Sequence, residues 1–460
     1  MPRISPRLAT AVIACAALAT VGAGALILTR DSGGQRGTGN PPTSAIERPS
    51  AGDGPDDAAR QVAQQTASPP GSSSGLPPCQ TATATDCDRS HLQASAGAHG
   101  SSACTGNGPA MMGASPIDLE EIAFIEPMGL MIGGHVTPID HGYFYIKGAR
   151  ENPPRQAAVK SPLHGVVTSI GRTVRHGGQN GDYDDYALTI EATCTFRVRF
   201  SNLVKFAGRL QDHIGELQPG QQTTANYEVA EGELIGYTGL PTAYGIDVWV
   251  ENDDATLTGF VNPEQYVTAE AWKLHMADLF DYTKEPLKSQ LLALDMREAS
   301  PRWGKIDYDI DGALVGSWFR QGSGGYRGLQ QGSEGYWDGH LSVVYDGNDP
   351  GQIVISIGNY QGHPQQFAAI GNTPDPAGVS PATGLVKYQL GQIMNYRGDT
   401  GEAWDHMSYI PHIRTRAGAS VIGTVLMQMT APRELKVEIF PGRTAADVAG
   451  FDSAALLYER

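Results

Sequence analysis

The sequence predicts a mainly β protein with two folded domains behind an N-terminal membrane segment. The 460 residues include 57 glycines and 30 prolines, so turns are too frequent for a helical bundle. From residue 115 onward, short runs alternate apolar with polar residues, which is typical of strands with one buried face. At about 100–200 residues per domain, the length allows two or three domains.

The overall charge excludes one class of partner. The chain has 49 acidic and 33 basic residues, giving a net charge of -16 and a pI near 5.1. A protein without a basic stripe lacks the electrostatic attraction on which phosphate binding depends. We therefore expect no nucleic-acid partner.

The first 30 residues predict a signal anchor or transmembrane helix. Leu8 to Thr29 is uncharged and apolar, and at about 1.5 Å per residue it can cross a hydrocarbon layer of about 30 Å. The folded domains are then extracytoplasmic, on a single-pass membrane protein. Cleavage after Val21–Ala23 and lipidation of Cys15, which follows Val-Ile-Ala, remain alternatives.

Residues 31–114 predict a disordered tether. They are rich in Gly, Ser, Pro and Thr and have few large apolar side chains to bury. Four cysteines beyond Cys15 suggest disulfides in an exported chain. We expect the pairs Cys79–Cys87 and Cys104–Cys194, with Cys79 and Cys87 as free thiols in the alternative.

Residues 115–267 predict the first β domain. Alternating runs occur at Ala187–Ala192, Thr195–Phe200 and Ile246–Val250, and glycine or acidic turns bound them. Many short strands with glycine turns indicate a barrel or a sandwich. The acidic loop Asp182–Asp185 is expected to be a solvated hairpin end, with His164 also in solvent.

Five motifs follow one another in order through this domain: GHVTPIDH at 134–141, VKSPLHGVVTSI at 159–170, FSNL at 200–203, VAEGELIGYTG at 229–239 and VNPEQY at 261–266. Their succession resembles the lysostaphin-type zinc peptidase family. The resemblance covers about a third of the chain. It implies a duplicated-hybrid-motif β fold and, for family members with a complete zinc site, cleavage of peptidoglycan cross-links.

This chain departs from the ligand set that the resemblance implies. The family holds zinc with a His-x-x-x-Asp motif and a His-x-His strand, but here His135 and Asp140 are five positions apart. Asp247 stands where the strand histidine is expected, and Asn202 replaces a catalytic histidine. Asparagine cannot act as a base near neutral pH. The sequence therefore predicts a degenerate domain without catalytic residues.

Three interpretations of this cluster remain open. The first is a metal site formed by His135, Asp140 and Asp247, with His141 as an alternative ligand. The second is a polar pocket that binds without cutting, and in the third Asp140 only caps a turn. The predicted binding residues are His135, Asp140, His141, Asn202, Asp247 and Trp249.

The predicted function is non-catalytic binding or scaffolding at the cell envelope, without a cofactor. The partner would be a cell-wall glycan or peptide, or another envelope protein, with the membrane contacted through the N-terminal helix. The alternative is a zinc-dependent peptidoglycan endopeptidase. Both follow from the family resemblance.

Residues 268–300 predict a helical connector, because apolar side chains from 264 to 298 recur near helical spacing. His275 is expected on its surface. Residues 301–460 predict a second antiparallel barrel or sandwich, closed by a helix at Ala445–Tyr458. Its expected strands are 313–319, 340–345, 352–357, 384–390, 421–429 and 434–440.

Two further motifs in residues 301–460 suggest ligands. Asp307, Asp309 and Asp311 before Gly312 match half of a calcium loop, but a plain hairpin with outward aspartates is favoured. The unit Gln-Gly-Ser-x-Gly-Tyr occurs at 321–326 and 331–336. Its aromatic residues would suit stacking on sugars, or would fold back on the sheet.

The predicted topology can be tested on intact cells. Protease added from outside should cut the tether and release a folded fragment that begins near Ser115, because a disordered segment is cleaved before a packed domain. Mass spectrometry of the released fragment gives its first residue. Retention of the folded domains inside the cytoplasm would contradict the predicted localisation.

Overall fold

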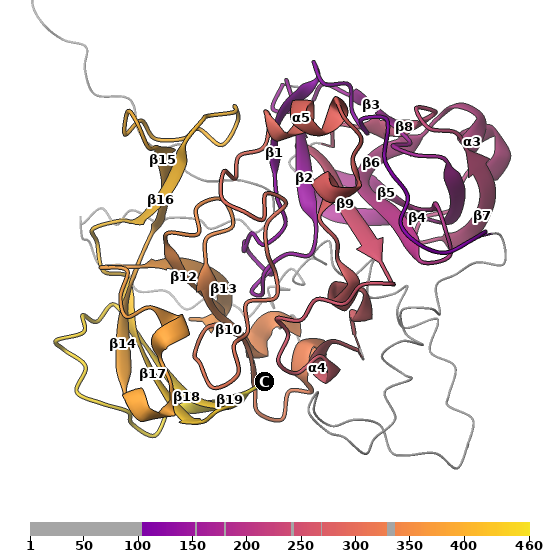
Figure 1. The fold of residues 1–460 in the computed structure, drawn as a ribbon. Coiled ribbons are helices and arrows are strands. Elements are labelled where there is room, and N and C mark those ends of the chain that lie inside the picture. The colour runs from indigo at the N-terminus through magenta and orange to yellow at the C-terminus, as the bar shows by residue number, and fades with distance from the viewer. Residues whose placement is uncertain (1–103, 152–153, 179–180, 241–242, 268, 329–335) are drawn as a thin grey trace, which may run out of the picture.

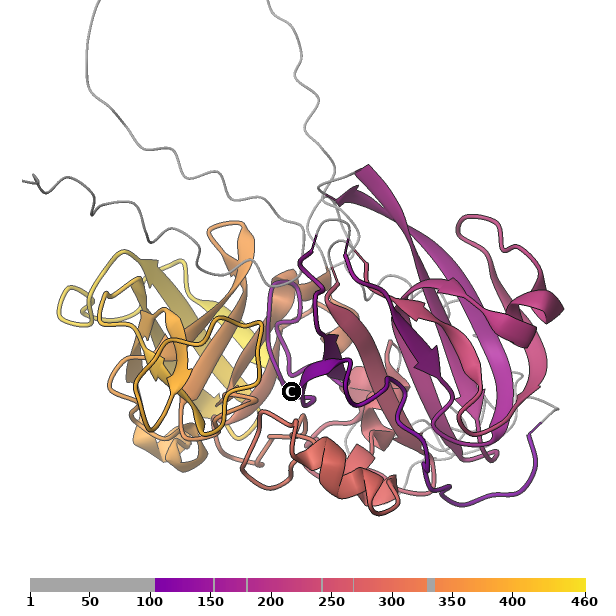
Figure 2. The ribbon, with the colours of Figure 1, turned by 90° about the horizontal axis from the view of Figure 1, so that it is seen from above.

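The computed structural model describes residues 104–460 apart from 152–153, 179–180, 241–242, 268 and 329–335. Two β bodies lie next to each other, and a segment of short helices joins them (Figure 1). Figure 2 shows the same two bodies from above. The predicted mainly β class is confirmed.

Several N-terminal predictions lie outside the described residues. They are the membrane segment, the tether up to residue 103 and the pair Cys79–Cys87. In the described part of the chain, no helix has the length and apolar character needed to cross a membrane.

The first body is a nine-stranded sheet with the order β1-β2-β9-β6-β5-β4-β7, to which β8 and β3 attach through β6. Its strands are β1 (Ile122–Glu126), β2 (Gly142–Ile146), β3 (Ala157–Lys160), β4 (Gly165–Gly178), β5 (Gly181–Glu191), β6 (Phe196–Phe206), β7 (Gln222–Val229), β8 (Leu234–Thr238) and β9 (Gly245–Asn252). A short helix, α3 (Gly208–Ile214), follows β6. The three runs predicted as strands lie in β5, β6 and β9.

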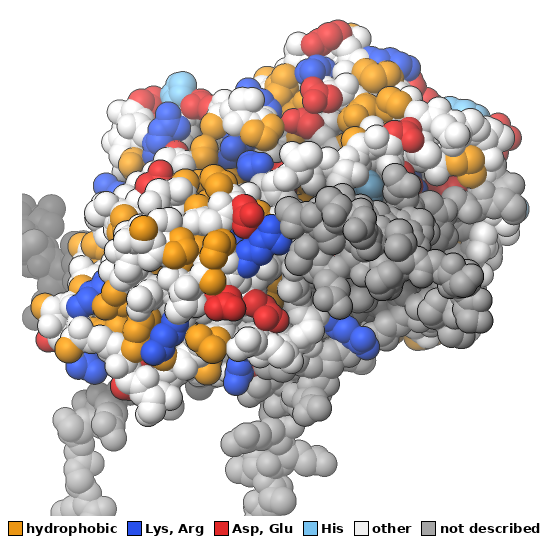
Figure 3. Space-filling view, turned by 60° about the horizontal axis from the view of Figure 1, so that its bottom comes forward, with side chains coloured by type: hydrophobic (Ala, Val, Ile, Leu, Met, Phe, Trp, Pro, Cys, Tyr) orange, Lys and Arg blue, Asp and Glu red, His pale blue; other side chains and the backbone are white. Residues whose placement is uncertain are grey.

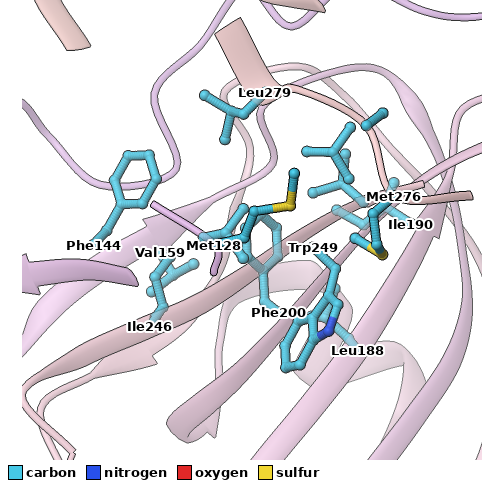
Figure 4. Packing of buried hydrophobic residues seen from close by; sticks show 14 of the residues in the cluster. Met128, Phe144, Val159, Leu188, Ile190, Phe200, Ile246, Trp249, Met276 and Leu279 are labelled. Carbon is cyan, nitrogen blue, oxygen red and sulfur yellow. The ribbon is translucent and has the colours of Figure 1, made fainter. Parts of the chain in front are cut away.

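Alternation along β6 gives the sheet two different faces. Phe196, Val198 and Phe200 are buried in the apolar core of the first body, part of which Figure 4 shows. Arg197 and Arg199 lie between them and point to the other face, because successive side chains of a strand alternate. Each buried side chain of this size contributes about 1.5–3 kcal/mol. The second face is left polar, and the candidate site lies on it.

The disulfide Cys104–Cys194 agrees with the prediction. The two Cα atoms are 5.1 Å apart, and 90 residues separate the cysteines in sequence. Next to it, the Cys194 N–H donates to the carbonyl of Gly106. The crosslink therefore holds residues 104–108 against the turn between β5 and β6 and restricts the unfolded chain.

The connector is built from separate turns: α4 (Glu264–Val267), η1 (Ala271–His275), η2 (Leu279–Tyr282) and α5 (Leu287–Leu292). A continuous helical pattern is thus wrong for 264–283. Met276 and Asp278 have extended backbone, and the Asp278 carboxylate accepts the N–H of Phe280 to start a new turn. His275 is buried rather than on the surface, and its Nδ1 is 2.7 Å from the carbonyl of Ala255.

The second body is a closed antiparallel barrel with the order β10-β11-β12-β13-β14-β17-β18-β19. Its strands are β10 (Gly316–Arg320), β11 (His340–Tyr345), β12 (Ile353–Tyr360), β13 (His363–Ala369), β14 (Val386–Gly391), β17 (Gly423–Ala431), β18 (Glu434–Pro441) and β19 (Leu456–Glu459). All six predicted runs overlap strands. Short 3-10 turns accompany them: η3 (Gly325–Arg327), η4 (Tyr336–Gly339), η5 (Pro376–Gly378) and η6 (Pro381–Thr383).

The predicted helix at Ala445–Tyr458 is wrong. This segment ends in β19, which pairs with β18 through Leu435↔Tyr458 and with β10 through Arg320↔Tyr458. Without β19, both β10 and β18 would expose unpaired backbone groups. The hydrogen-bonding demand of two strand edges therefore overrides the local helical pattern.

Contacts of several kinds join the two bodies. A hairpin of β15 (Ile393–Arg397) and β16 (Ile413–Ala417) extends from the barrel (Figure 1). In its loop, Trp404 packs edge-on against Phe124 of β1 with ring centroids 5.3 Å apart. Next to β1, Asn348 donates its Nδ2 hydrogen to Glu126 over 2.9 Å. The amide of Gln366 on β13 pairs with the backbone of Gly133 in both directions.

Glu126 makes this junction sensitive to pH. Burial raises the pKa of Glu126 to about 7 from 4.5, and its bonds with Asn348 and Tyr145 offset only part of the shift. Between these two values the folded protein binds more protons than the unfolded chain. The stability from this residue is therefore present at low pH and is lost as the pH rises through about 7.

The variant Glu126→Gln should remove this dependence. We expect its free energy of unfolding to exceed that of the parent by roughly 1–3 kcal/mol at pH 8 and by close to nothing at pH 4. Urea unfolding at both pH values measures the difference. The matched control is Glu120→Gln, at an exposed position just before β1. An equal gain for both variants, or none at pH 8, would contradict the assignment.

Candidate functional site

Three neighbouring strands bring the predicted site residues together. Asp140 and His141 directly precede β2, and β2 pairs with β9 so that Tyr143 lies opposite Asp247. On the other side of β9, Ser201 of β6 lies opposite Asp247. The strand order β2-β9-β6 therefore places Asp140, His141 and Asp247 in one cluster, as the order of the motifs predicts.

Four donors surround the carboxylate of Asp140, which is 5 % exposed. Oδ1 lies 2.8 Å from Nδ1 of His141 and accepts the indole N–H of Trp249 over 3.1 Å. Oδ2 accepts the indole N–H of Trp272 over 2.7 Å and lies 3.4 Å from Nζ of Lys273. Both carboxylate oxygens are thus occupied by groups of the protein itself.

These donors keep Asp140 ionised. Burial by itself would raise the pKa of this carboxyl, but the Lys273 ammonium, His141 and the Trp272 N–H hold its pKa well below the usual range. An ionised carboxylate out of water is tolerated only when it is paired and hydrogen-bonded. Lys273 is itself 5 % exposed, and its Nζ also forms an ion pair with Oε2 of Glu270 over 3.1 Å.

Asp247 forms the second half of the cluster. Its Oδ2 accepts the hydroxyl of Ser201 over 2.6 Å, and its Oδ1 accepts the amide of Asn202 over 2.7 Å. Nε2 of His141 lies 4.0 Å from Oδ2. His141 therefore lies between Asp140 on one side and Asp247 on the other.

Asn202 has a left-handed backbone, with φ 61°. Its N–H donates to the Asp185 carboxylate over 2.9 Å, and the other oxygen of Asp185 is held by Arg175 at 2.9 Å. Asp185 is 4 % exposed, and burial raises its pKa despite the pairing with Arg175. The expectation of a fully solvated loop at Asp182–Asp185 is therefore wrong for Asp185.

His135 lies at the edge of the cluster. It is 9 % exposed, and its ring centroid is 5.8 Å from that of His141. The barrel holds the preceding residues through the Gln366 amide on Gly133, and a side chain at Gly134 would meet the ring of Trp337. His135 therefore lies beside His141, close to the other predicted site residues.

The predicted zinc ligands do not fit a metal ion in this arrangement. Both oxygens of Asp140 already accept hydrogen bonds, and Nδ1 of His141 is directed at Asp140. In the described part of the chain, no group of three or more His, Cys, Asp or Glu side chains is placed to hold a metal. Asp140 and Asp247 belong instead to a hydrogen-bonded polar cluster, with His135 at its edge.

A cavity of about 140 Å³ opens beside the cluster on the polar face of the sheet. Strands β4, β5, β6, β7 and β9 form its floor, and Trp272 of η1 borders it. The side chains that carry its chemistry are His141, Arg175, Arg199 and Trp249. Aromatic surface with a few fixed polar groups is the composition of binding sites for small molecules and peptides.

Sequence reasoning missed three residues of this site. They are Lys273, which neutralises Asp140; Trp272, whose indole N–H donates to Asp140; and Arg199, which lines the cavity. The strand alternation of Arg197, Arg199 and Ser201 was the available signal for Arg199. Nothing local to residues 264–283 indicates that η1 folds over the polar face.

The half calcium loop does not form a cation site. Asp307 pairs with Lys305, Asp309 accepts the N–H of Ser317, and Asp311 pairs with Arg433. Burial raises the pKa of Asp309 to about 6, against the opposing effect of Arg460. The favoured hairpin is also wrong, because Asp307 and Asp309 are buried whereas Ile310 is 50 % exposed.

The aromatic repeat folds inward. Tyr326 and Tyr336 are 3 % and 5 % exposed, and their ring centroids are 5.9 Å apart. Residues 329–335 between them lie outside the described part. Of the two alternatives, the structure therefore agrees with the one in which these tyrosines fold back on the protein. The prediction for His164 is confirmed, because its side chain is 67 % exposed.

Comparison of the chain with protein-family profiles, with curated proteins and with solved structures finds no match.

The charge of Lys273 can be tested by Lys273→Met. The variant leaves Asp140 buried without a cation, so we expect a loss of about 3–5 kcal/mol of unfolding free energy at pH 7. The low pKa of Asp140 stabilises the fold above pH about 4, and this contribution is lost as the pH falls through the folded pKa. The defect should therefore shrink in acid.

The matched control is Lys288→Met, because Lys288 is 32 % exposed and faces an exposed Asp281. It should cost about 0–1 kcal/mol. Urea unfolding of both variants at pH 7 and pH 3 gives the comparison. A similar loss for both variants would mean that Lys273 does not compensate a buried charge.

Proposed function

We propose that this chain is a non-catalytic binding or scaffolding protein of the cell envelope. Its first body would be a degenerate lysostaphin-type domain with the duplicated-hybrid-motif fold, and its ligand a cell-wall glycan or peptide. The observation that carries the proposal is a cavity on the polar sheet face, next to a carboxylate whose oxygens are already occupied by the protein.

The chemistry of the cluster supports binding over hydrolysis. A catalytic metal site needs free ligand atoms and a group that moves protons. Here Asp140 is engaged by Trp249, Trp272 and Lys273, while Asn202 donates to Asp247. Every one of these contacts fixes a side chain in place. A rigid, preorganised wall is what a binding cavity requires.

The cavity suits a ligand with both apolar and polar surface. Trp249 and Trp272 line it with aromatic rings, and Thr173 lines it with a hydroxyl group. Aromatic side chains pack well against sugar rings and peptide side chains.

Two features support a location outside the cytoplasm. Cys104 and Cys194 have disulfide geometry, and disulfides persist in oxidising compartments. Leu8–Thr29 is long enough to anchor the chain in a membrane. On the face in Figure 3, acidic and basic side chains are interspersed over the described part, in keeping with a partner other than nucleic acid.

Cosedimentation with insoluble peptidoglycan tests this function. The full chain should pellet with the cell wall, and Trp249→Ala should weaken binding about 10-fold or more, as expected for an aromatic anchor. Tyr396→Ala, on the β15–β16 hairpin, is the control and should pellet like the parent.

The same samples test for hydrolysis. We expect no soluble wall fragments, with or without added zinc. Zinc-dependent release that His135→Ala abolishes would establish the alternative, a zinc endopeptidase. Failure of the parent to pellet with any wall preparation would contradict the proposed ligand.

A further inference from the structure

Arg199 lies against two aromatic rings at the cavity. Its guanidinium carbon lies 5.1 Å from the ring centroid of Trp249 and 5.0 Å from that of Trp272. Nη1 donates to Oε1 of Glu251 over 3.1 Å. The two ring contacts and the hydrogen bond restrict the guanidinium, which then loses little freedom on binding a ligand.

One edge of this guanidinium is available. The described residues provide no acceptor for Nε and Nη2 of Arg199, and its side chain is 20 % exposed where it lines the cavity. Arg197, on the same strand face, differs because Glu251 and Asp253 take its terminal nitrogens. The Nε and Nη2 hydrogens of an arginine point in one direction and match the two oxygens of a carboxylate.

The charges that line the cavity disfavour a doubly charged anion more than a singly charged one. Arg175, Arg197 and Arg199 are balanced by three lining carboxylates. The lining carboxylates are Asp185, Glu191 and Glu251. A dianion such as phosphate would add two charges to this balanced lining, whereas a carboxylate adds one.

We propose that Arg199 is a carboxylate-binding residue, and that the cavity takes the carboxylate end of a short peptide with the neighbouring side chain against Trp249 and Trp272. The cavity of about 140 Å³ is smaller than the roughly 300–1,000 Å³ of sites for drug-sized ligands, so it admits one residue and not a long ligand. This inference rests on the proposed binding function and specifies the chemistry that the site recognises.

Indole NMR signals of the full chain give a direct test. With ¹⁵N-tryptophan the protein has six indole signals, and Trp249→Phe and Trp272→Phe assign the two in the cavity. N-acetyl-alanyl-alanine should shift both signals. Its C-terminal amide should bind at least tenfold more weakly, and Arg199→Met should weaken binding of the acid by at least tenfold.

The controls separate recognition from folding. Arg209→Met removes an exposed arginine that pairs with Glu233, and it should leave the titration unchanged. If Arg199→Met disturbs the other four indole signals, Arg199→Lys replaces it, and this charged but non-planar variant should also bind more weakly. Equal binding of acid and amide, a response to inorganic phosphate alone, or no response to any probe would overturn the proposal.

The outcome is also independent of the cell-wall experiment. Cosedimentation that Arg199→Met leaves unchanged would overturn the carboxylate site and keep the binding function. A titration that depends on Arg199, without cosedimentation, would support the carboxylate site and contradict the wall ligand.

Discussion

The buried charge of Asp140 is the constraint on which the arrangement of this protein depends. An ionised carboxylate away from water costs several kcal/mol unless donors and a cation compensate it. The compensation comes from β9 through Trp249 and from η1 through Trp272 and Lys273. Lys273 also lies 5.0 Å from the ring of Tyr326 near the barrel. One carboxylate thus ties the sheet, the connector and the second body together.

The ammonium of Lys273 takes the place that a metal ion would have in neutralising Asp140. In a metal centre, charge neutralisation depends on an ion that exchanges with solvent and on deprotonated ligands. Here the compensating charge is covalently part of the chain, and the low pKa of Asp140 keeps the pair intact over the neutral range. The charge of the Asp140–Lys273 pair is therefore kept during moderate acidification.

Most strands could be predicted from the residue pattern of their own segment, whereas the site depends on contacts between residues that are far apart in the sequence. The alternation of apolar and polar residues identified β5, β6, β9 and most barrel strands, because this pattern depends only on the two faces of the strand itself. It did not identify β19, whose pairing depends on two distant edges. The motif order placed Asp140 near Asp247, but Lys273 could not be assigned, because only the broken turns at 264–283 bring it over the sheet. Side chains that compensate a buried charge carry no signal in their own segment.

The closure of the barrel by β19 affects the order of folding during synthesis. β10 is joined to β19 across the rest of the barrel sequence, so this contact spans a long loop and is slow to form. A chain that emerges from its N-terminal side can complete the first sheet early, while β10 keeps an open edge until residues 456–459 arrive. In that interval the partly formed barrel is open to wrong strand pairing.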